Sequence, residues 1–352
     1  LYQLLLGHPK SPSCSMDQVE LHKVLNSYTH PNTGRSLLQV STALAIYLAS
    51  ITFLITLLHF QAPVLVILLL SLLTSPIIVQ LFIIFHDCCH TSYFASRKAC
   101  FLLGHFLGVL TFTAYCDWQR THGIHHRCMA NLERRGVGDV WLMTLSEYRN
   151  AGKWTKLRYR LYRNPLFMFF VSAPFLFLIL NRVPSKGFRK RELLSVLFTD
   201  FMLVLLLSFA SALIGWKGLL LILLPMMLGA SVLGVWLFYV QHQFRQVYWA
   251  HNGEWDRFRA AMEGSSLYLM PAILRWLSGN IGYHHIHHLA PRIPNYRLKE
   301  CFDEIPELQE IDPVPYLSGL RNISLSLWDE ESGLLVGFRE ALEIIEKRES
   351  TQ

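Results

Sequence analysis

"SPIIVQLFIIFHDCCH" (residues 75–90) begins as an apolar run and ends in two closely spaced histidines. The run is part of an apolar stretch over residues 63–85, which Pro76 interrupts. That stretch is long enough to cross a bilayer core of about 30 Å. His86 and His90 follow it four residues apart, so on a helix they share one face. The sequence therefore joins a membrane-spanning segment directly to a pair of potential metal ligands.

The composition of the whole chain is typical of a membrane protein. Of 352 residues, 52% are apolar and only 16% are charged, compared with roughly 25% in an ordinary soluble domain. The net charge of +7 does not indicate nucleic acid, because such an excess in a membrane protein usually lies in cytoplasmic loops. Seven cysteines without a CxxC pair argue against a disulfide framework or a cysteine-based zinc module.

Four apolar runs are long enough to span a membrane, namely residues 37–60, 63–85, 194–216 and 219–240. Very short turns, Gln61-Ala62 and Lys217-Gly218, join them in pairs and so predict two helical hairpins. Two shorter runs, residues 99–115 and 165–180, are predicted to lie in the interface or to re-enter. A full crossing by either run would put the histidine clusters on opposite sides of the membrane.

The distribution of basic residues predicts the orientation. Five of them follow the run over residues 165–180 directly, whereas the hairpin turns carry only Lys217; the five are Arg182, Lys186, Arg189, Lys190 and Arg191. By the positive-inside rule the basic loops are cytoplasmic. We therefore expect an all-α integral membrane protein with four transmembrane helices in two hairpins, interfacial or re-entrant helices and a cytoplasmic histidine-rich cap.

This topology divides the chain into three parts. Residues 1–36 are expected to form a cytoplasmic segment, residues 37–310 the membrane domain and residues 311–352 a cytoplasmic tail. Within the tail, apolar residues at helical spacing predict an amphipathic helix over residues 329–347; they are Leu334, Leu335, Phe338, Leu342 and Ile345. Asp200, inside the third apolar run, is expected to be interfacial or paired with a neighbouring helix rather than catalytic.

Nine of the 16 histidines fall into four clusters just outside the apolar runs. The clusters are "HDCCH" (86–90), "HGIHH" (122–126), "FYVQHQF" (238–244) and "HHIHH" (284–288). The predicted topology brings them to one membrane surface. Nine imidazoles are too many for one metal ion but suit two ions with four or five ligands each. His285 lies about 100° from the face that the rest of its cluster shares, so we do not expect it to be a ligand. The isolated His59 and His105 are expected to be structural.

The ligand set narrows the possible functions. Neither HExxH nor ExxH occurs, which argues against a zinc protease and against a soluble di-iron carboxylate site. A site of almost pure histidine at a membrane face favours a redox centre with two metal ions. A membrane metal transporter is the alternative from another class, although transporters usually place polar ligands near the midplane of the bilayer.

The histidine boxes and their surroundings resemble the membrane fatty acid desaturases, in particular the bacterial acyl-lipid branch related to plant oleate desaturases. The likeness covers about residues 40 to 310. It rests on "HDCCHTSYF" (86–94), "WQRTHGIHHRCMANLERRGVGDVWLMTLSEY" (118–148), "FYVQHQF" (238–244) and "SGNIGYHHIHHLAPRIPNYRL" (278–298).

The resemblance implies a di-iron centre that uses dioxygen as co-substrate to introduce a cis double bond into a lipid-linked acyl chain, with release of water. The implied ligands are His86, His90, His122, His125, His126, His242, His284, His287 and His288. A hydroxylase or ketolase acting on a fatty chain or a carotenoid, on the same scaffold, is the alternative. We expect the protein to lie in the bacterial plasma membrane, with the active site on the cytoplasmic face that the basic loops indicate.

The resemblance also implies an electron donor, either a ferredoxin or a b-type cytochrome. Some eukaryotic relatives carry a fused cytochrome domain with a His-Pro-Gly-Gly motif. Here "GHPK" (residues 7–10) is not that motif, so we expect a separate donor. A basic surface could steer an acidic donor or meet lipid head groups, and both readings stay open; its residues are Lys156, Arg158, Arg160 and Arg163.

Further residues are candidates for supporting roles. A metal-bound histidine usually donates its other N–H to a carboxylate or a carbonyl group. Asp87, Asp117 and Asp139 lie in or beside the boxes, and Asn280 precedes His284 by one helical turn. We expect the acyl chain to enter a narrow apolar tunnel, and the aromatic candidates for its wall are Phe112, Tyr115, Trp118 and Trp236.

Overall fold

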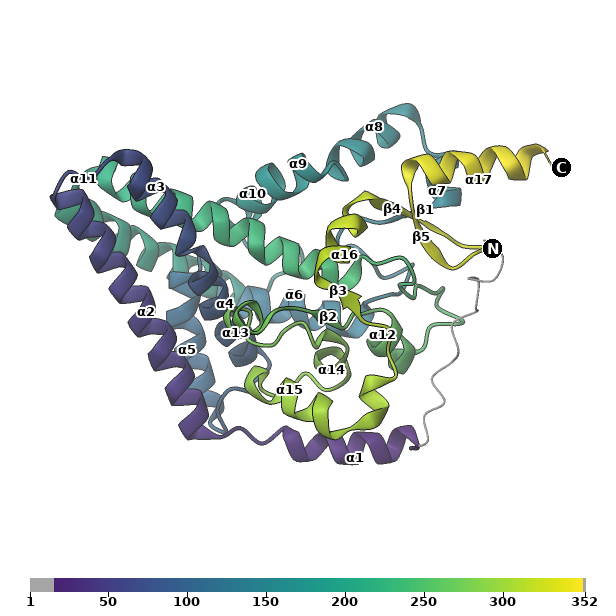
Figure 1. Ribbon diagram of the computed structural model, residues 1–352, viewed down its shortest axis with the longest axis horizontal. Coiled ribbons are helices and arrows are strands. Elements are labelled where there is room, and N and C mark those ends of the chain that lie inside the picture. Colours follow the sequence, from purple (N-terminus) through teal and green to yellow (C-terminus); the bar gives the residue numbers. More distant parts are fainter. Residues whose placement is uncertain (1–15, 351–352) are drawn as a thin grey trace.

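The computed structural model describes residues 16–350, and these form a mostly helical protein (Figure 1). The "GHPK" stretch lies outside the described residues. The helices are α1 (Gln18–Tyr28), α2 (Thr33–His59), α3 (Val64–Leu73), α4 (Ser75–Cys89), α5 (Arg97–Leu110), α6 (Tyr115–Cys128), α7 (Leu145–Asn150), α8 (Lys153–Tyr162), α9 (Pro165–Phe167), α10 (Ala173–Leu178), α11 (Lys190–His242), α12 (Arg257–Glu263), α13 (Ala272–Leu277), α14 (His284–Leu289), α15 (Asn295–Glu304), α16 (Tyr316–Arg321) and α17 (Phe338–Ser350). A π-helical turn, η2 (Met168–Ser172), and three 3-10 turns, η3 (Leu180–Arg182), η4 (Pro306–Gln309) and η5 (Asn322–Ser324), complete the helical elements.

The first pair of long helices consists of α2 and the combined α3 and α4. The side chain of Asn32 caps the start of α2 by accepting a hydrogen bond from the backbone N–H of Arg35. The turn after α2 contains Gln61 in the left-handed region, at φ 54°. Pro76 lies in the first turn of α4, where its missing N–H leaves no helical hydrogen bond unmade. The apolar stretch over residues 63–85 is therefore helical on both sides of this proline.

The second pair of long helices is formed by the two halves of α11. This element has 53 residues, but Gly215 has non-helical angles (φ 72°, ψ 155°). Both ends of α11 contact α6. Ser195 Oγ accepts a hydrogen bond of 3.0 Å from the backbone N–H of Cys116, and His242 Nε2 lies 3.2 Å from His125 Nε2. Because those two α6 residues are only about 14 Å apart along the helix, the halves of α11 must run back along each other.

The turns of the two helix pairs lie together at the end of the molecule remote from the histidines (Figure 1). A Cβ atom added at Gly218 would lie 2.4 Å from Leu58 Cδ2, at the end of α2. Deeper in the bundle, a Cβ atom at Gly229 would lie 2.2 Å from Ser75 Oγ. Close approach at these two glycines lets the second half of α11 pack directly on the α2–α4 pair.

Among residues 16–350, four helical segments are long and apolar enough to cross a membrane, or five if the bent pair of α5 and α6 forms one broken span. They are Thr33–His59, Val64–Cys89, Pro165–Arg182 and Lys190–His242. The first two contain the first two predicted spans, and the last contains the other two. Pro165–Arg182 overlaps the run predicted to be interfacial, yet it qualifies by length and composition. Its interfacial placement stays a prediction.

The run over residues 99–115 ends in a sharp bend. Helices α5 and α6 meet there at 101°, and Phe112 in the bend has a φ of 55°. Gly104 lets α5 pack closely on the ring of Tyr115 at the start of α6, because a Cβ atom at residue 104 would lie 2.2 Å from Tyr115 Cε2. Tyr115 cannot move aside easily, since its ring is buried and its hydroxyl donates to the carbonyl of Cys88 at 2.8 Å. The bend directs α6, with its three histidines, back toward the end of α4.

The structure contains strands, so the all-α prediction was wrong in this respect. Strand β4 (Leu325–Asp329) pairs in parallel with β1 (Met143–Thr144) and antiparallel with β5 (Leu334–Gly337). A second sheet pairs β2 (Tyr268–Leu269) in parallel with β3 (Val314–Pro315). The short strands β1 to β3 tie the C-terminal region to loops earlier in the chain.

The amphipathic helix predicted from residue 329 begins only at Phe338. Leu334 and Leu335 lie in β5 instead, after a turn in which Gly333 has a φ of 65° and donates to the carbonyl of Asp329. Leu335 and Trp328 are buried in a cluster with Leu132, Leu142, Val247, Trp249 and Leu325. These partners are remote in sequence, and they override the local helical pattern.

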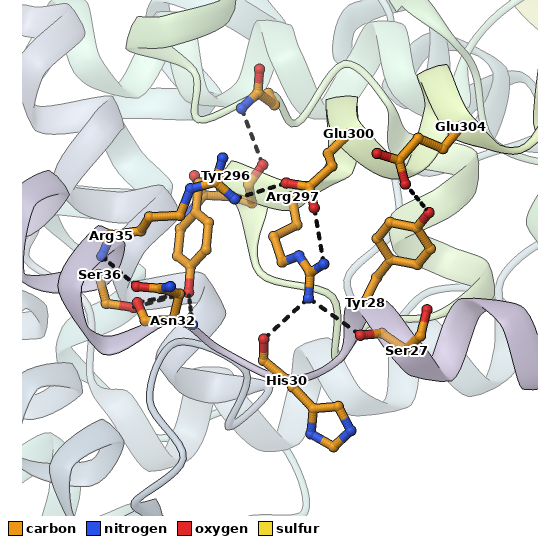
Figure 2. Close-up of polar contacts among 12 residues, drawn as sticks. Ser27, Tyr28, His30, Asn32, Arg35, Ser36, Tyr296, Arg297, Glu300 and Glu304 are labelled. Carbon is orange, nitrogen blue, oxygen red and sulfur yellow. Dashed lines mark hydrogen bonds and ion pairs between the residues drawn. The ribbon is translucent and has the colours of Figure 1, made fainter.

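The start of α2 is fastened to α15, which follows the fourth histidine cluster (Figure 2). Figure 2 shows the ion pair between Arg35 and Glu300, at 2.7 Å, and the Tyr28 hydroxyl donating to Glu304. The backbone N–H of Asn32 donates to the Tyr296 hydroxyl at 2.9 Å. The first transmembrane candidate is therefore tied to the histidine-bearing end of the molecule.

The contact at Gly104 generates a stability prediction. Gly104→Ala should lower the free energy of unfolding by about 1–3 kcal/mol, because the new methyl group overlaps the fixed ring of Tyr115. Gly152→Ala is the matched control, since a Cβ atom there meets nothing within 4 Å. Thermal unfolding of the purified proteins in detergent measures both. Equal stability of the two variants would contradict the packing described for the bend.

Candidate metal centre

Four elements bring the nine predicted histidines to one place. His86 lies in the last turn of α4 and His90 caps that helix. Helix α6 carries His122, His125 and His126, and α11 ends at His242. The short helix α14 carries His284, His287 and His288, whose spacing of three and four residues puts them on one face.

The first group holds five of these histidines. The ligand nitrogens of His86, His90, His122, His126 and His287 all lie within 4.8 Å of one another. The Nε2 atom of His122 lies 3.0 Å from that of His86 and 2.9 Å from that of His126. The Nε2 atom of His126 is in turn 3.0 Å from that of His287. The group therefore draws on α4, α6 and α14.

The second group holds the remaining four. His125, His242 and His288 have ligand nitrogens within 4.8 Å of one another, and all three side chains are buried. The Nε2 atoms of His125 and His242 are 3.2 Å apart. His284 joins them, with its Nε2 atom 3.0 Å from that of His242 and 3.1 Å from that of His288. The second group draws on α6, α11 and α14.

The spacing of the nitrogens fits ligands that share a metal ion. The Nε2 atom of His122 has two close nitrogen neighbours, one in His86 and one in His126. A ring nitrogen carries at most one hydrogen, in the plane of the ring, so a single N–H donated by His122 cannot explain both contacts. With metal–nitrogen bonds of about 2.1 Å, neighbouring ligands lie about 3.0 Å apart at right angles and about 3.4 Å apart in a tetrahedron. The observed separations of 2.9 to 3.2 Å are closer to the first arrangement. Both groups therefore have the nitrogen spacing of side chains that could share a metal ion.

The other ring nitrogens of three histidines have partners that fix the tautomer. Nδ1 of His125 lies 2.8 Å from Asp139 Oδ1, and Nδ1 of His86 lies 3.3 Å from Asp87 Oδ1. Nδ1 of His242 lies 3.2 Å from the carbonyl oxygen of Gly264. Each of these oxygens accepts a hydrogen bond from Nδ1, which leaves the lone pair on Nε2 free to bind a metal. Asp87 and Asp139, two of the candidates for this role, thus each accept a hydrogen bond from one of the nine histidines.

Asp117 and Asn280, the other two candidates for this role, do not contact a histidine. The carboxylate of Asp117 accepts hydrogen bonds from the hydroxyl of Ser185, at 2.6 Å, and from its backbone N–H. It caps a loop, and no hydrogen bond joins it to any of the nine histidines. Asn280 donates from Nδ2 to the carbonyl of Asn295 at 3.1 Å.

Asn295 is a residue of the site that no motif or spacing in the sequence indicates. It is fully buried, and its backbone N–H and its Nδ2 atom donate to Asp87 Oδ2 at 2.7 and 2.8 Å. It therefore holds the carboxylate that orients His86. Asn295 lies in the quoted stretch after the fourth cluster, but no spacing in the sequence connects it to Asp87.

Burial keeps the histidines of α14 neutral. Loss of solvation lowers the pKa of His284, His287 and His288 well below the usual value, and neighbouring histidines lower it further. The imidazoles are therefore unprotonated at neutral pH, as metal ligands must be. The centre needs no proton release from these three side chains before it binds a metal.

His285 lies outside both groups. Its Nε2 atom donates to the carbonyl of Leu308 at 3.1 Å, and burial lowers its pKa to about 4. His105 donates from Nδ1 to the carbonyl of Phe101 at 2.9 Å. His59 packs edge-on against Phe60, with ring centroids 5.5 Å apart. All three have structural contacts away from the nine.

The four aromatic candidates for a tunnel wall have different surroundings. Trp118 stacks on His122, with ring centroids 4.1 Å apart. Tyr115 is buried beneath α4, Phe112 occupies the bend before α6, and Trp236 packs against Phe169. A small apolar cavity of about 20 Å³ lies between α4, α10 and α11, and none of the four lines it. Of the four, Trp118 is in contact with a histidine of the centre, and the tunnel itself stays a prediction.

Comparison with known proteins agrees with this geometry. A family model described as fatty acid desaturase matches residues 29–319, which include all nine histidines. A fatty acid desaturase from Bacillus subtilis (strain 168) is 38% identical over 322 residues, covering 92% of this chain and 91% of that protein.

Two more distant relatives have more specific names. An omega-3 fatty acid desaturase of the endoplasmic reticulum from Vigna radiata var. radiata is 26% identical, and the alignment covers 63% of this chain and 60% of that protein. An sn-1 acyl-lipid omega-3 desaturase (ferredoxin) from Synechocystis sp. is 24% identical, and the alignment covers 64% of this chain and 63% of that protein. The family match and the long alignment with the Bacillus protein both extend over most of the sequence. The chain therefore belongs to the fatty acid desaturase family, which its histidine boxes resemble.

Proposed function

We propose that the nine histidines hold two iron ions, five at one and four at the other. The observation that carries this proposal is the division of the nine into two groups with ligand-like nitrogen spacing. When bound, the iron ions would activate dioxygen so that two hydrogens leave adjacent methylenes of an acyl chain and water is released. The neutral imidazoles leave both ions electron-poor, which suits a strong oxidant.

The chain's own residues would orient and shield this centre. Asp87 and Asp139 would hold the rings of His86 and His125 by accepting their Nδ1 hydrogens, and Asn295 would hold Asp87. Trp118 lies over His122 and edge-on to Phe82, which lines the apolar cavity between α4 and α11. We propose that the reacting segment of the acyl chain passes along this side of Trp118.

We also propose that the substrate is an acyl chain carried by a lipid and that the electrons come from a separate donor. The name of the Synechocystis relative specifies both an acyl-lipid substrate and ferredoxin. A b-type cytochrome is the other donor class that the sequence left open.

The histidine-bearing end is proposed to face the cytoplasm of a bacterial cell, across the plasma membrane. The basic loop before α11 lies at this end, since Arg191 donates to Gln119 Oε1 at 2.8 Å and Arg120 donates to Ser185. The turns of both long helix pairs lie at the other end. This is the distribution that the positive-inside rule describes.

Helix α8 fits the lipid interface better than a donor-docking surface. Its Trp154, Leu157 and Leu161 are 67%, 56% and 52% exposed and recur at helical spacing. Arg163 is only 3% exposed and donates to Gln243 and to the carbonyl of Leu325, so it does not belong to an exposed basic surface of either kind. We propose that α8 lies in the membrane interface, with its basic residues among the head groups.

Expression in a host with saturated membrane lipids tests the function. Analysis of fatty acid methyl esters should show a new double bond in chains that the host leaves saturated. A hydroxylated product without a double bond would favour the hydroxylase alternative. Metal transport without any oxidised lipid would favour the transporter.

His287→Ala should abolish desaturation and lower the iron content, because His287 contributes a nitrogen to the five-histidine group. His285→Ala is the matched control, two residues away in the same cluster and on another face of the helix. It leaves the Leu308 carbonyl without its donor, so we expect lower stability but unchanged iron per folded chain and substantial activity. Iron analysis and product analysis of membrane-inserted protein measure both. Full activity of His287→Ala would remove it from the ligand set.

Asp139→Asn should weaken iron binding in the four-histidine group by about 10- to 100-fold, because the amide no longer favours the Nδ1 hydrogen of His125. Asp117→Asn should retain both irons, since its partners are Ser185 and Arg120. Iron retained during dialysis against a chelator distinguishes the two. Equal loss from both variants would contradict the assigned roles.

A further inference from the structure

A pocket of about 500 Å³ opens between α2, α4, α13 and α15, beside the metal centre. Of its twelve lining residues, three are basic (Arg35, Arg275 and Lys299) and none is acidic. We call it the basic pocket. Its polar wall also includes Gln39, Gln80 and Asn280.

The charges of the basic pocket are partly available to a ligand. Arg35 pairs with Glu300 at 2.7 Å and lies over the ring of Tyr296, as Figure 2 shows for these residues. Lys299 pairs with Asp303 at the surface. Arg275 has no carboxylate partner among residues 16–350, and its side chain interacts with Tyr283. Three cations and no carboxylate line the pocket itself, which favours an anion there.

Gln80 supplies an independent sign of a ligand. Its side chain is only 1% exposed, and its Nε2 atom donates to the carbonyl of Trp276 at 3.2 Å. Its Oε1 atom is buried and has no hydrogen-bond partner among the described residues. A buried acceptor left unpaired costs about 1–3 kcal/mol. An O–H or N–H group of a ligand in the basic pocket would satisfy it.

An apolar groove lies beside the basic pocket. Trp276 lines both, and the groove of about 300 Å³ follows α2 and the α3–α4 junction past Ile46, Ser50, Phe53 and Leu73. Arg35 lies in the first turn of α2, whereas Phe53 lies about 27 Å further along the same helix. A ligand that fills both must therefore be polar and anionic at one end and apolar over roughly the length of an acyl chain.

A chain of hydrogen bonds connects the basic pocket to the metal centre. Gln39 in its wall donates to Asn295 Oδ1 at 2.8 Å, and Asn295 donates to Asp87 Oδ2 at 2.8 Å. Asp87 in turn accepts from His86. Asn280, also in the wall, donates to the carbonyl of Asn295. The polar wall of the pocket is thus two side chains away from a proposed iron ligand.

We propose that the basic pocket binds the phosphate-bearing head group of a glycerophospholipid, with one acyl chain in the apolar groove, and that this lipid is the substrate. The phosphate lies among Arg35, Arg275 and Lys299, and a head-group hydroxyl or ammonium faces Gln80. This inference names the class of lipid on which the proposed desaturase acts. It rests on the proposed function, because only that function has the second acyl chain desaturated at the metal centre.

The test uses the iron-loaded full chain in nanodiscs that contain equal amounts of dipalmitoylphosphatidylglycerol and a neutral dipalmitoyl glucosyl diacylglycerol. The wild type should desaturate the phospholipid preferentially. The double variant Arg275→Gln, Lys299→Gln should lose about tenfold or more of this rate, with the rate on the glycolipid unchanged. Arg321→Gln, Arg339→Gln removes two exposed charges outside the pocket and should retain the preference.

Native mass spectrometry of the same proteins gives a readout that needs no turnover. The wild type should retain phosphatidylglycerol, and the pocket variant should lose it. Equal retention by both, or equal rates on both lipids, would overturn the head-group site even if desaturation occurs. Inhibition by inorganic phosphate without any lipid preference would assign the pocket to free phosphate and also overturn it. Selective lipid retention without any double bond would support the site and refute the desaturase function.

Discussion

Nine imidazole rings gathered into two groups, with ligand nitrogens a few ångströms apart within each, are the constraint on which the structure depends. To bind a metal ion, each ring must present an unprotonated nitrogen to it. No single helix can supply nine, because a cluster on one helix offers only the residues of one face. The chain meets this requirement with α4, α6, α11 and α14, whose histidines meet in a group of five and a group of four.

The long helices explain how these four elements reach one point. Each pair of helices leaves the histidine end and returns to it, because the turn after α2 and the non-helical Gly215 reverse the chain. The bend between α5 and α6 then directs the second cluster across the end of α4. Where helices must approach closely, glycines 104, 218 and 229 leave room that a side chain would fill. Asn295 and Asp87 connect the resulting centre to the start of α2 and to the basic pocket beside it.

Much of this arrangement could be predicted from the sequence, because apolar run length and histidine spacing are local properties. The nine histidines converge as the clusters suggested, and the apolar runs are helical. The exceptions depend on contacts between distant residues. Leu334 and Leu335 pair in a sheet, where Leu335 packs in one cluster with Trp328 and Trp249 and Leu334 against another with Leu327, and no local pattern shows this. Asn295 donates a hydrogen bond to Asp87, from which it is separated by 208 positions in the sequence. Asp117 accepts a hydrogen bond from Ser185, and no hydrogen bond joins it to the histidine cluster that follows it.

We propose that the two histidine groups would each hold one metal ion. Iron X-ray absorption of the purified, iron-loaded protein, together with metal analysis, measures both the number of ions and their ligands. We expect about two irons per chain and a first shell of imidazole-type nitrogens at about 2.1 Å, without sulfur. A single tetrahedral metal ion per chain, or a shell containing cysteine sulfur, would contradict it.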